Sequence, residues 1–321
     1  LIELAPGQPL NVGTDIANGL LPGSVNARVT LSPLPPIPFG QVLDDLLKYP
    51  YGCAEQTTTR GYAALLLDAD TARRMGFTGL TPDERRKRLE GAFTRLSSMQ
   101  TSSGHFSFWG GDSEAYPVLT PYIAEFLLES REAGFAVPES TLQKALERLK
   151  EDLLTGSAPF YGYSNRDHLR FAYQAQAGYA LARLNRAPLG TLRALYDNDR
   201  AKAKTPLALM YLGLALNLQG DQARGKKAIA EAFAKKDERE GYWGDYGSSL
   251  RDQALMLMLA RKYKLKTPQA EARLLAISKQ LAAEEGGMYR WYSTQEQIAL
   301  ARLAKTMMAD IDPTNAIAGD V

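Results

Sequence analysis

The feature that most constrains the fold is the spacing of apolar residues beyond residue 40, where they recur every three or four positions. That period lines one face of an α-helix, whereas a half-buried strand alternates with a period of two. Glycine and proline interrupt the pattern at short intervals, which predicts an all-α domain of ordinary helices with short connections. The predicted helical segments are 53–68, 82–99, 118–133, 139–154, 168–185, 189–197, 205–218, 221–235, 249–263, 267–283 and 294–309.

A weak internal repeat suggests how these helices are arranged. Tyr163-Ser164-Asn165-Arg166, Tyr246-Gly247-Ser248-Ser249 and Tyr292-Ser293-Thr294 each precede a long apolar helix. Serine or threonine at such a place is a good N-cap. Small residues are frequent in the helical segments 172–184 and 254–260, which suits a crowded inner ring. Repeated helix pairs therefore favour an α/α toroid of about six pairs over an open solenoid.

The first 38 residues follow a different pattern. Apolar and polar residues alternate between positions 25 and 31, which predicts a strand with one buried face. Four prolines between positions 33 and 38 then form a linker that can be neither helix nor central strand. A single strand cannot bury its own apolar face, so we expect its sheet partners outside this sequence. The predicted organisation is a β segment with linker over 1–38, a helical domain over 39–310 and a C-terminal exit segment over 311–321.

The single cysteine lies in the stretch Tyr49-Pro50-Tyr51-Gly52-Cys53-Ala54-Glu55-Gln56. Proline and glycine interrupt the chain just before Cys53, so Cys53 falls near a helix N-terminus, where the helix dipole favours a thiolate. Gln56 lies in the same first turn, so the two side chains can meet on one face. The Cys53 thiol can then attack the Gln56 amide, expel ammonia and form an internal thioester, an acyl donor that is used once. The alternative is a small buried apolar cysteine.

This stretch resembles the thioester motif of the α2-macroglobulin and complement family. It is most similar to the bacterial α2-macroglobulins, in which alanine follows the cysteine as Ala54 does here. Two further segments resemble the aromatic loop and the following helix of the thioester domain: Gly104-His105-Phe106-Ser107-Phe108-Trp109 and Leu119-Thr120-Pro121-Tyr122. The resemblance covers most of residues 40–310. It implies an α/α toroid inserted in a β-sandwich, the CUB domain, to which residues 1–38 contribute the leading strand.

For function, the resemblance implies a domain of a protease inhibitor that traps attacking proteases covalently through their amine nucleophiles. Such a trap reacts once and is not a turnover enzyme, and it needs no cofactor beyond the Cys53–Gln56 thioester. Its partners are target proteases and the macroglobulin-like and CUB domains of the same polypeptide. The chain begins at Leu1 without a signal-peptide pattern, so we expect a piece of a longer polypeptide. The implied location is the periplasm, with an inner-membrane anchor through a preceding lipoprotein segment.

Other residues near the motif have proposed roles and plainer alternatives. The resemblance assigns to Tyr49 the shielding of the bond from water, and Tyr51 flanks the bond as well, although both can simply pack in a loop. Some complement proteins use a downstream histidine to transfer the acyl group. That position falls in the loop 158–168, nearer Tyr161 than His168, and a surface or capping histidine is the alternative.

Glu55, between the reacting residues, is either a first-turn carboxylate that serves the helix dipole or a direct participant in the chemistry. If no histidine transfers the acyl group, direct attack by a lysine amine is the expected route.

Composition excludes several other functions. The chain has 38 Lys and Arg against 36 Asp and Glu, with no basic block, which argues against a nucleic-acid partner. No apolar run reaches the length of a membrane span. No metal site is predicted, because the one cysteine has no thiol partner and the two histidines are isolated.

A rival interpretation is a carbohydrate-active enzyme on a similar toroid. Such enzymes use paired carboxylates and aromatic platforms for sugars. Asp112 and Glu114 near the aromatic loop would supply the carboxylates. The aromatic platforms would come from Trp243, Tyr246, Trp291 and Tyr292.

Overall fold

The structure is a computed structural model of the chain. It describes residues 18–19, 21, 43, 46–49, 52–74, 79–111, 114–157, 164–285 and 292–309. The predicted strand at 25–31, the proline linker and the segment 311–321 lie outside the described residues, and so do Tyr51 and Tyr161. The proposed boundaries of the β segment and the exit segment therefore stay predictions.

The described residues form an all-α fold, as the apolar spacing predicts. Every predicted helical segment is present, with ends that differ from the prediction by at most a few residues, and one short helix, α3, was not predicted. The helices are α2 (Ala54–Leu66), α3 (Ala69–Arg74), α4 (Pro82–Met99), α5 (Leu119–Glu132), α6 (Glu139–Thr155), α7 (Arg166–Ala182), α8 (Leu189–Asp199), the 3-10 helix η2 (Arg200–Lys202), α9 (Pro206–Leu218), α10 (Gln222–Ala234), α11 (Ser249–Lys262), α12 (Pro268–Glu285) and α13 (Thr294–Ala309).

Local capping explains where several of these helices begin. At α4, Thr81 Oγ1 accepts a hydrogen bond from Glu84 N at 3.2 Å, and the Glu84 carboxylate accepts one from Thr81 N at 2.9 Å. This reciprocal pair satisfies two backbone donors that the first helical turn leaves free. At α11, Ser248 Oγ accepts from Arg251 N at 3.1 Å. The N-cap predicted at Ser248 from the internal repeat is therefore confirmed.

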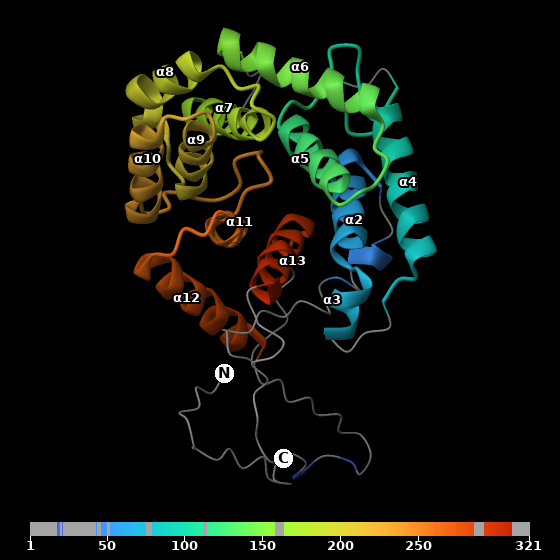
Figure 1. Ribbon diagram of the computed structural model, residues 1–321. Helices are drawn as coiled ribbons and strands as arrows, with labels where there is room; N and C mark the ends of the chain where they lie inside the picture. The colour runs from blue at the N-terminus through green and yellow to red at the C-terminus, as the bar shows by residue number, and fades with distance from the viewer. Residues whose placement is uncertain are drawn as a thin grey trace.

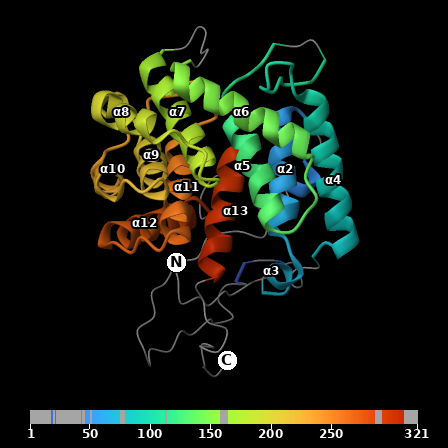
Figure 2. The ribbon, with the colours of Figure 1, turned by 45° about the horizontal axis from the view of Figure 1, so that its top comes forward.

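The helices form a ring of inner and outer members (Figures 1 and 2). The inner helices are α2, α5, α7, α9, α11 and α13, and each contacts the next. Helix α13 in turn contacts α2, so the inner ring is closed. Helices α4, α6, α8, α10 and α12 pack against the outside of this ring. The predicted toroid is confirmed, and its beginning and its end meet at one seam.

Close backbone approach at two glycines shapes the packing. A Cβ atom at Gly61 on α2 would lie 2.4 Å from Phe126 Cζ on α5, and one at Gly225 on α10 would lie 2.0 Å from Asn217 Oδ1. Real Cβ contacts are not this short, so both positions need glycine for the helices to touch. At Gly61 the ring of Phe126 fills the space that a side chain would need, between two inner helices of the ring.

A buried ionic group also holds the seam together. Arg302 on α13 donates to Glu129 Oε1 on α5 at 2.7 Å, and its guanidinium lies 4.7 Å from the centre of the Tyr62 ring on α2. A buried charge is tolerated when it is paired and hydrogen-bonded in this way. Arg302 therefore links its own helix, α13, to two other inner helices, α5 and α2. In the part of the chain that the structure describes, no helix is both long enough and apolar enough to cross a membrane.

Candidate functional site

The structure brings Cys53 and Gln56 together at the seam. Cys53 is the N-cap residue of α2, with φ −66° and ψ 172°, and it is 7% exposed. Its backbone N–H donates a hydrogen bond to Gln56 Oε1 at 3.2 Å, which turns the amide of Gln56 back toward Cys53. The predicted position of Cys53 at a helix start is confirmed. The hydrogen bond runs from the Cys53 backbone to the Gln56 side chain, so the meeting of the two side chains stays a prediction.

Three neighbours fix the conformation of this turn. The carbonyl oxygen of Gly52 accepts hydrogen bonds from Arg95 Nε at 2.9 Å and from Thr57 Oγ1 at 3.2 Å. The N–H of Ala54, which the helix leaves without an internal partner, donates to the carbonyl of Phe108 at 2.8 Å. Because α4 and the aromatic loop both contribute, the position of Cys53 depends on tertiary structure as well as on its own helix.

Aromatic side chains enclose the same region. The ring of Phe108 packs against Tyr116 at 4.5 Å and Tyr246 at 6.5 Å between centroids, and Tyr116 Oη donates to the carbonyl of Gly244 at 2.6 Å. Burial raises the pKa of the Tyr246 hydroxyl, and the negative charge of Glu55 raises it further. The sequence analysis did not predict that these three rings would lie at the Cys53 turn. The only signal in the local sequence was the aromatic composition of their loops.

The other predicted cover is described in part. Tyr49 precedes the turn and is partly buried. Tyr51 lies outside the described residues. Trp109, at the end of the aromatic loop segment, is 65% exposed.

The electrostatics of Cys53 differ from the expectation at one point. The helix dipole was expected to favour the thiolate, but burial raises the pKa of the Cys53 thiol above its ordinary value. The backbone N–H groups of Gln56 and Glu55 and the charge of Arg95 act in the opposite direction and are outweighed. Loss of hydration destabilises the Cys53 thiolate more than the helix N-terminus stabilises it. The thiol therefore stays protonated at neutral pH.

Glu55 has a structural role that its position in the sequence did not reveal. Its side chain is 3% exposed. Its Oε1 atom accepts hydrogen bonds from Gln295 Nε2 at 2.7 Å, Thr59 Oγ1 at 2.8 Å and Thr294 Oγ1 at 3.0 Å. The carboxylate therefore joins the first turn of α2 to the first turn of α13 at the ring seam. Glu55 lies in the first turn of α2, as one of the two predicted roles requires, and it is also buried and anchored, which was not predicted.

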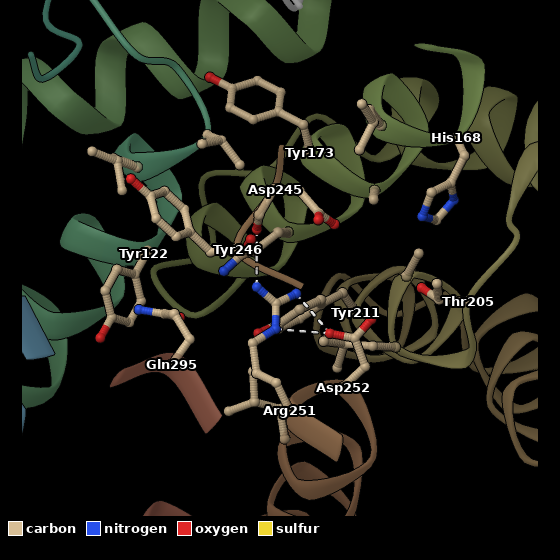
Figure 3. Close-up of a pocket in the computed structure, with 18 of the residues that line it drawn as sticks. Tyr122, His168, Tyr173, Thr205, Tyr211, Asp245, Tyr246, Arg251, Asp252 and Gln295 are labelled. Carbon is tan, nitrogen blue, oxygen red and sulfur yellow. Dashed lines mark hydrogen bonds and ion pairs between the residues drawn. The ribbon is translucent and has the colours of Figure 1, made fainter. Parts of the chain in front are cut away.

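His168 lies elsewhere, on the wall of a central cavity of about 60 Å³ (Figure 3). Tyr122 and Gln295 line the opposite wall, and Cys53 is not among the described residues that line it. His168 Nδ1 accepts from the N–H of Lys204 at 3.0 Å. Burial lowers the pKa of His168 to about 4. The ring is therefore neutral and turned to the ring interior. Tyr161, the other candidate for acyl transfer, is outside the described residues.

His105 is also buried and structural. Its Nδ1 atom lies 2.9 Å from Thr120 Oγ1, and its Nε2 atom lies 3.4 Å from an oxygen of Asp152. Burial lowers its pKa, although the charge of Asp152 opposes that shift. His105 thus links the aromatic loop to α5 and α6 and is not a surface histidine.

The residues proposed for a carbohydrate-active enzyme are described in part, because Asp112 and Trp291 lie outside the described residues. Trp243 is buried and packs against His168 at 5.2 Å between ring centroids, so its faces are not open to a sugar. The acids of the central cavity are paired with arginines. Arg251 Nε donates to Asp252 at 2.8 Å (Figure 3). Asp245 binds Arg239. Burial alone would raise the pKa of Asp245, but Arg239 and Arg251 lower it to about 2. The comparisons below give the carbohydrate-active interpretation no support.

Comparisons with known proteins agree on one family. The chain is 54% identical over 303 residues to the alpha-2-macroglobulin of Xylella fastidiosa, a match that covers 94% of this chain and 18% of the relative. It is 36% identical over 309 residues to the alpha-2-macroglobulin of Escherichia coli, covering 95% of this chain and 18% of that protein. The chain thus spans less than a fifth of the length of these relatives. No family model matches it.

Solved structures give the same answer for the fold. A crystal structure of native alpha-2-macroglobulin from Escherichia coli, spanning domain MG7 to the C-terminus, matches with a TM-score of 0.80 at 35% identity. That match covers 85% of this chain and 42% of the solved chain. Salmonella alpha-2-macroglobulin reacted with methylamine matches with a TM-score of 0.79 at 38% identity, covering 85% of this chain and 17% of that one.

The class of the protein follows from these findings: a closed helical toroid with a buried Cys-Ala-Glu-Gln turn where its first and last inner helices meet. The chain belongs to the bacterial α2-macroglobulin family, of whose members it matches a part.

Proposed function

We propose that this chain is the thioester domain of a bacterial α2-macroglobulin that inhibits proteases by covalent capture. The observation that carries the proposal is the Cys53–Gln56 turn, in which Cys53 N–H binds Gln56 Oε1 at 3.2 Å. That hydrogen bond orients the amide and also polarises its carbonyl. The same N–H is placed to stabilise negative charge on Oε1 when a nucleophile adds to the amide carbon, as donors of an oxyanion hole do.

Formation of the bond would be an internal acyl transfer. The Cys53 Sγ atom attacks Gln56 Cδ, the Cδ–Nε2 bond breaks, and the thiol proton leaves with the amide nitrogen as ammonia. The product is an Sγ–Cδ thioester within one helical turn. This product carries no charge, so its burial costs less than burial of the thiolate would.

Capture would reverse the roles of the two residues. A lysine amine of an attacking protease adds to Cδ, the Sγ–Cδ bond breaks, and an amide joins Gln56 to that lysine. The sulfur leaves as a thiolate and then takes up a proton. A thiol with a high pKa leaves slowly. Since burial raises the pKa of Cys53, the closed site would keep the bond unreactive toward water and amines until its surroundings change.

The aromatic side chains near the turn fit the requirement that the bond be kept from water. Phe108, Tyr116 and Tyr246 pack against one another beside Cys53, and Tyr49 precedes it. An apolar wall of this kind keeps water from a hydrolysable bond. His168 lies in the central cavity with its Nδ1 already bound, which favours direct attack by an amine over transfer through that histidine.

The names of the solved relatives support the same function. One Salmonella structure is described as reacted with methylamine, and Escherichia coli structures are described as activated by trypsin and by porcine elastase. By relation to them, we infer that this chain reacts once with amines and is not a turnover enzyme. Its partners would be target proteases and the macroglobulin-like and CUB domains of the same polypeptide. Its location would be the periplasm, with a lipoprotein anchor to the inner membrane.

Intact mass tests the proposal directly. The folded chain should be lighter than its sequence predicts by the mass of ammonia, about 17 Da, and methylamine should release one thiol per chain. A bond that has already reacted with water leaves a glutamate side chain at position 56, so peptide mapping of that position completes the test. An unmodified glutamine there together with a free Cys53 thiol in the folded, untreated chain would overturn the proposal.

A further inference from the structure

A surface groove between α2 and α4 has a concentration of positive charge. The groove has a volume of about 360 Å³ and is lined by Arg60 from α2 and by Lys87, Arg88 and Arg95 from α4. Gly52, the residue before Cys53, lines one end of it. Because the whole chain has a net charge of only +2, this is a local feature of the surface.

Three of these cations are not neutralised within the described part of the chain. Lys87 pairs with Asp83 at 2.8 Å. Arg88 donates to the carbonyl of Leu47 at 3.3 Å and Arg95 to the carbonyl of Gly52 at 2.9 Å, and no acidic side chain among the described residues pairs with either. A carbonyl orients a guanidinium without cancelling its charge.

Arg60 shows the effect of several positive charges held close together. It is half-buried, and no described acid pairs with it. Burial lowers its pKa, and the positive charges of Arg88 and Arg95 lower it further. Arg224 on α10, by contrast, binds both Asp197 and Asp221. Like charges held together repel one another unless an anion lies between them.

The groove is also kept open by a glycine. Gly91 lies in the interior of α4, on the same face as Arg88 and Arg95. A Cβ atom at this position would have no atom within 4 Å, so packing does not require glycine. Glycine is unfavourable inside a helix compared with alanine. A side chain here would project into the groove, and its absence leaves room for a ligand.

We propose that this groove, formed by Arg60, Arg88 and Arg95, binds an acidic peptide segment. Guanidinium groups bind carboxylates with two parallel hydrogen bonds, and three of them here face one concave space. A nucleic acid would need a longer basic track along the surface. Since Gly52 lines the groove, the bound segment lies directly beside the Cys53–Gln56 turn. The proposal does not depend on formation of the thioester.

Fluorescence anisotropy with a labelled acetyl-hexaglutamate peptide and the whole chain tests this surface. We expect saturable binding at 20 mM salt that weakens as salt rises, and no binding of the matching hexaglutamine peptide. The double substitution Arg60→Gln and Arg88→Gln should raise Kd at least tenfold. The matched control, Lys226→Gln and Lys227→Gln on the exposed face of α10, removes the same charge and should change Kd less than twofold.

A second variant guards against loss of folding. Gly91→Glu keeps all three arginines and places a carboxylate in the groove, so it should abolish peptide binding while the chain still unfolds cooperatively. Arg95 is left unchanged throughout because it holds Gly52. Failure of the peptide to bind at 20 mM salt, or an equal loss in the α10 control, would overturn the proposal. Tighter binding of a thymidine oligonucleotide at the same arginines would overturn the assignment to a peptide.

Discussion

Glu55 Oε1 accepts a hydrogen bond from Gln295 Nε2 at 2.7 Å and so joins residues that are 240 positions apart in the sequence. Glu55 lies between Cys53 and Gln56, and Gln295 lies in the first turn of the last inner helix. The same oxygen also binds Thr59 and Thr294. The turn that carries the candidate chemistry and the seam that closes the ring are therefore one structural unit.

Loss of this carboxylate should destabilise the fold. Glu55→Ala leaves the buried amide of Gln295 and two hydroxyls without their acceptor, which should lower the free energy of unfolding by about 2–4 kcal/mol. Urea unfolding followed by circular dichroism measures this. Glu90→Ala, on the exposed face of α4, is the control and should change stability by less than about 0.5 kcal/mol. Equal losses of unfolding free energy in the two variants would show that Glu55 does not stabilise the seam.

Substitution of the reacting pair should separate chemistry from folding. Cys53→Ala and Gln56→Ala should each abolish incorporation of isotopically labelled methylamine, because each removes one partner of the proposed bond. Both variants should still unfold cooperatively, since only the first turn of α2 changes. Intact mass gives the incorporation. Labelling of Cys53→Ala to the level of the unsubstituted chain would contradict the proposed thioester.

Two glycines should respond to alanine in opposite directions. Gly61→Ala places a Cβ atom 2.4 Å from Phe126, a fully buried ring that also packs against Tyr62 and Phe93. Overpacking of this kind should cost about 1–3 kcal/mol. Gly91→Ala meets nothing within 4 Å and should stabilise α4 by up to about 1 kcal/mol. Denaturant midpoints compare the pair, and a loss of stability in both would show that the groove is not open.

The stability of the fold should depend on pH through His168. Burial lowers its pKa from 6.5 to about 4, whereas the unfolded chain keeps the ordinary value. The unfolded state therefore binds more protons between pH 6.5 and 4, and stability falls as pH falls through that window. The loss from pH 7 to pH 5 should be about 2 kcal/mol. In His168→Gln this part of the pH dependence should vanish from urea unfolding; an unchanged slope would show that His168 is charged in the folded state.

The choice of nucleophile should favour amines. A hydroxyl needs a base to attack an acyl carbon, and His168 is neutral, buried and bound to Lys204 N–H. Capture should therefore rise with pH as amines lose protons, and glycerol should compete poorly with methylamine. His168→Ala should leave this preference unchanged. Competition followed by intact mass decides the matter, and efficient glycerol capture that His168→Ala abolishes would make His168 the transfer catalyst.

Local sequence patterns predicted most of the fold because helices depend on nearby residues. The segments predicted at 82–99, 205–218 and 267–283 and the predicted N-cap Ser248 agree with helix starts in the structure. The pairing of Cys53 with Gln56 was equally accessible, since three residues of spacing within one turn fix it. Among the described residues, the six-residue helix α3, the 3-10 helix η2 and the helical residues 43 and 46–48 were missed, because short helices do not show a period.

Local sequence patterns could not predict contacts between residues far apart in the chain. Nothing near Glu55 indicates that Thr294 and Gln295 bind it, and nothing near Cys53 indicates that Tyr246 approaches it. The same limit explains why the effect of the surroundings on the Cys53 thiol was predicted in the wrong direction. A helix start predicts a favoured thiolate, but burial reverses this, and burial is a property of the tertiary structure that the local sequence does not show.

The ring seam imposes an order of events on a growing chain. Thr294 and Gln295 are synthesised 239 and 240 residues after Glu55. At about 5–20 residues per second, the interval is on the order of ten to fifty seconds. Throughout it, Glu55 has no partner on α13, and for most of it Tyr246 has not yet been made. The hydrogen bonds that anchor Glu55 therefore wait for the last inner helix, so the seam beside Cys53 is completed only after translation has passed the start of α13.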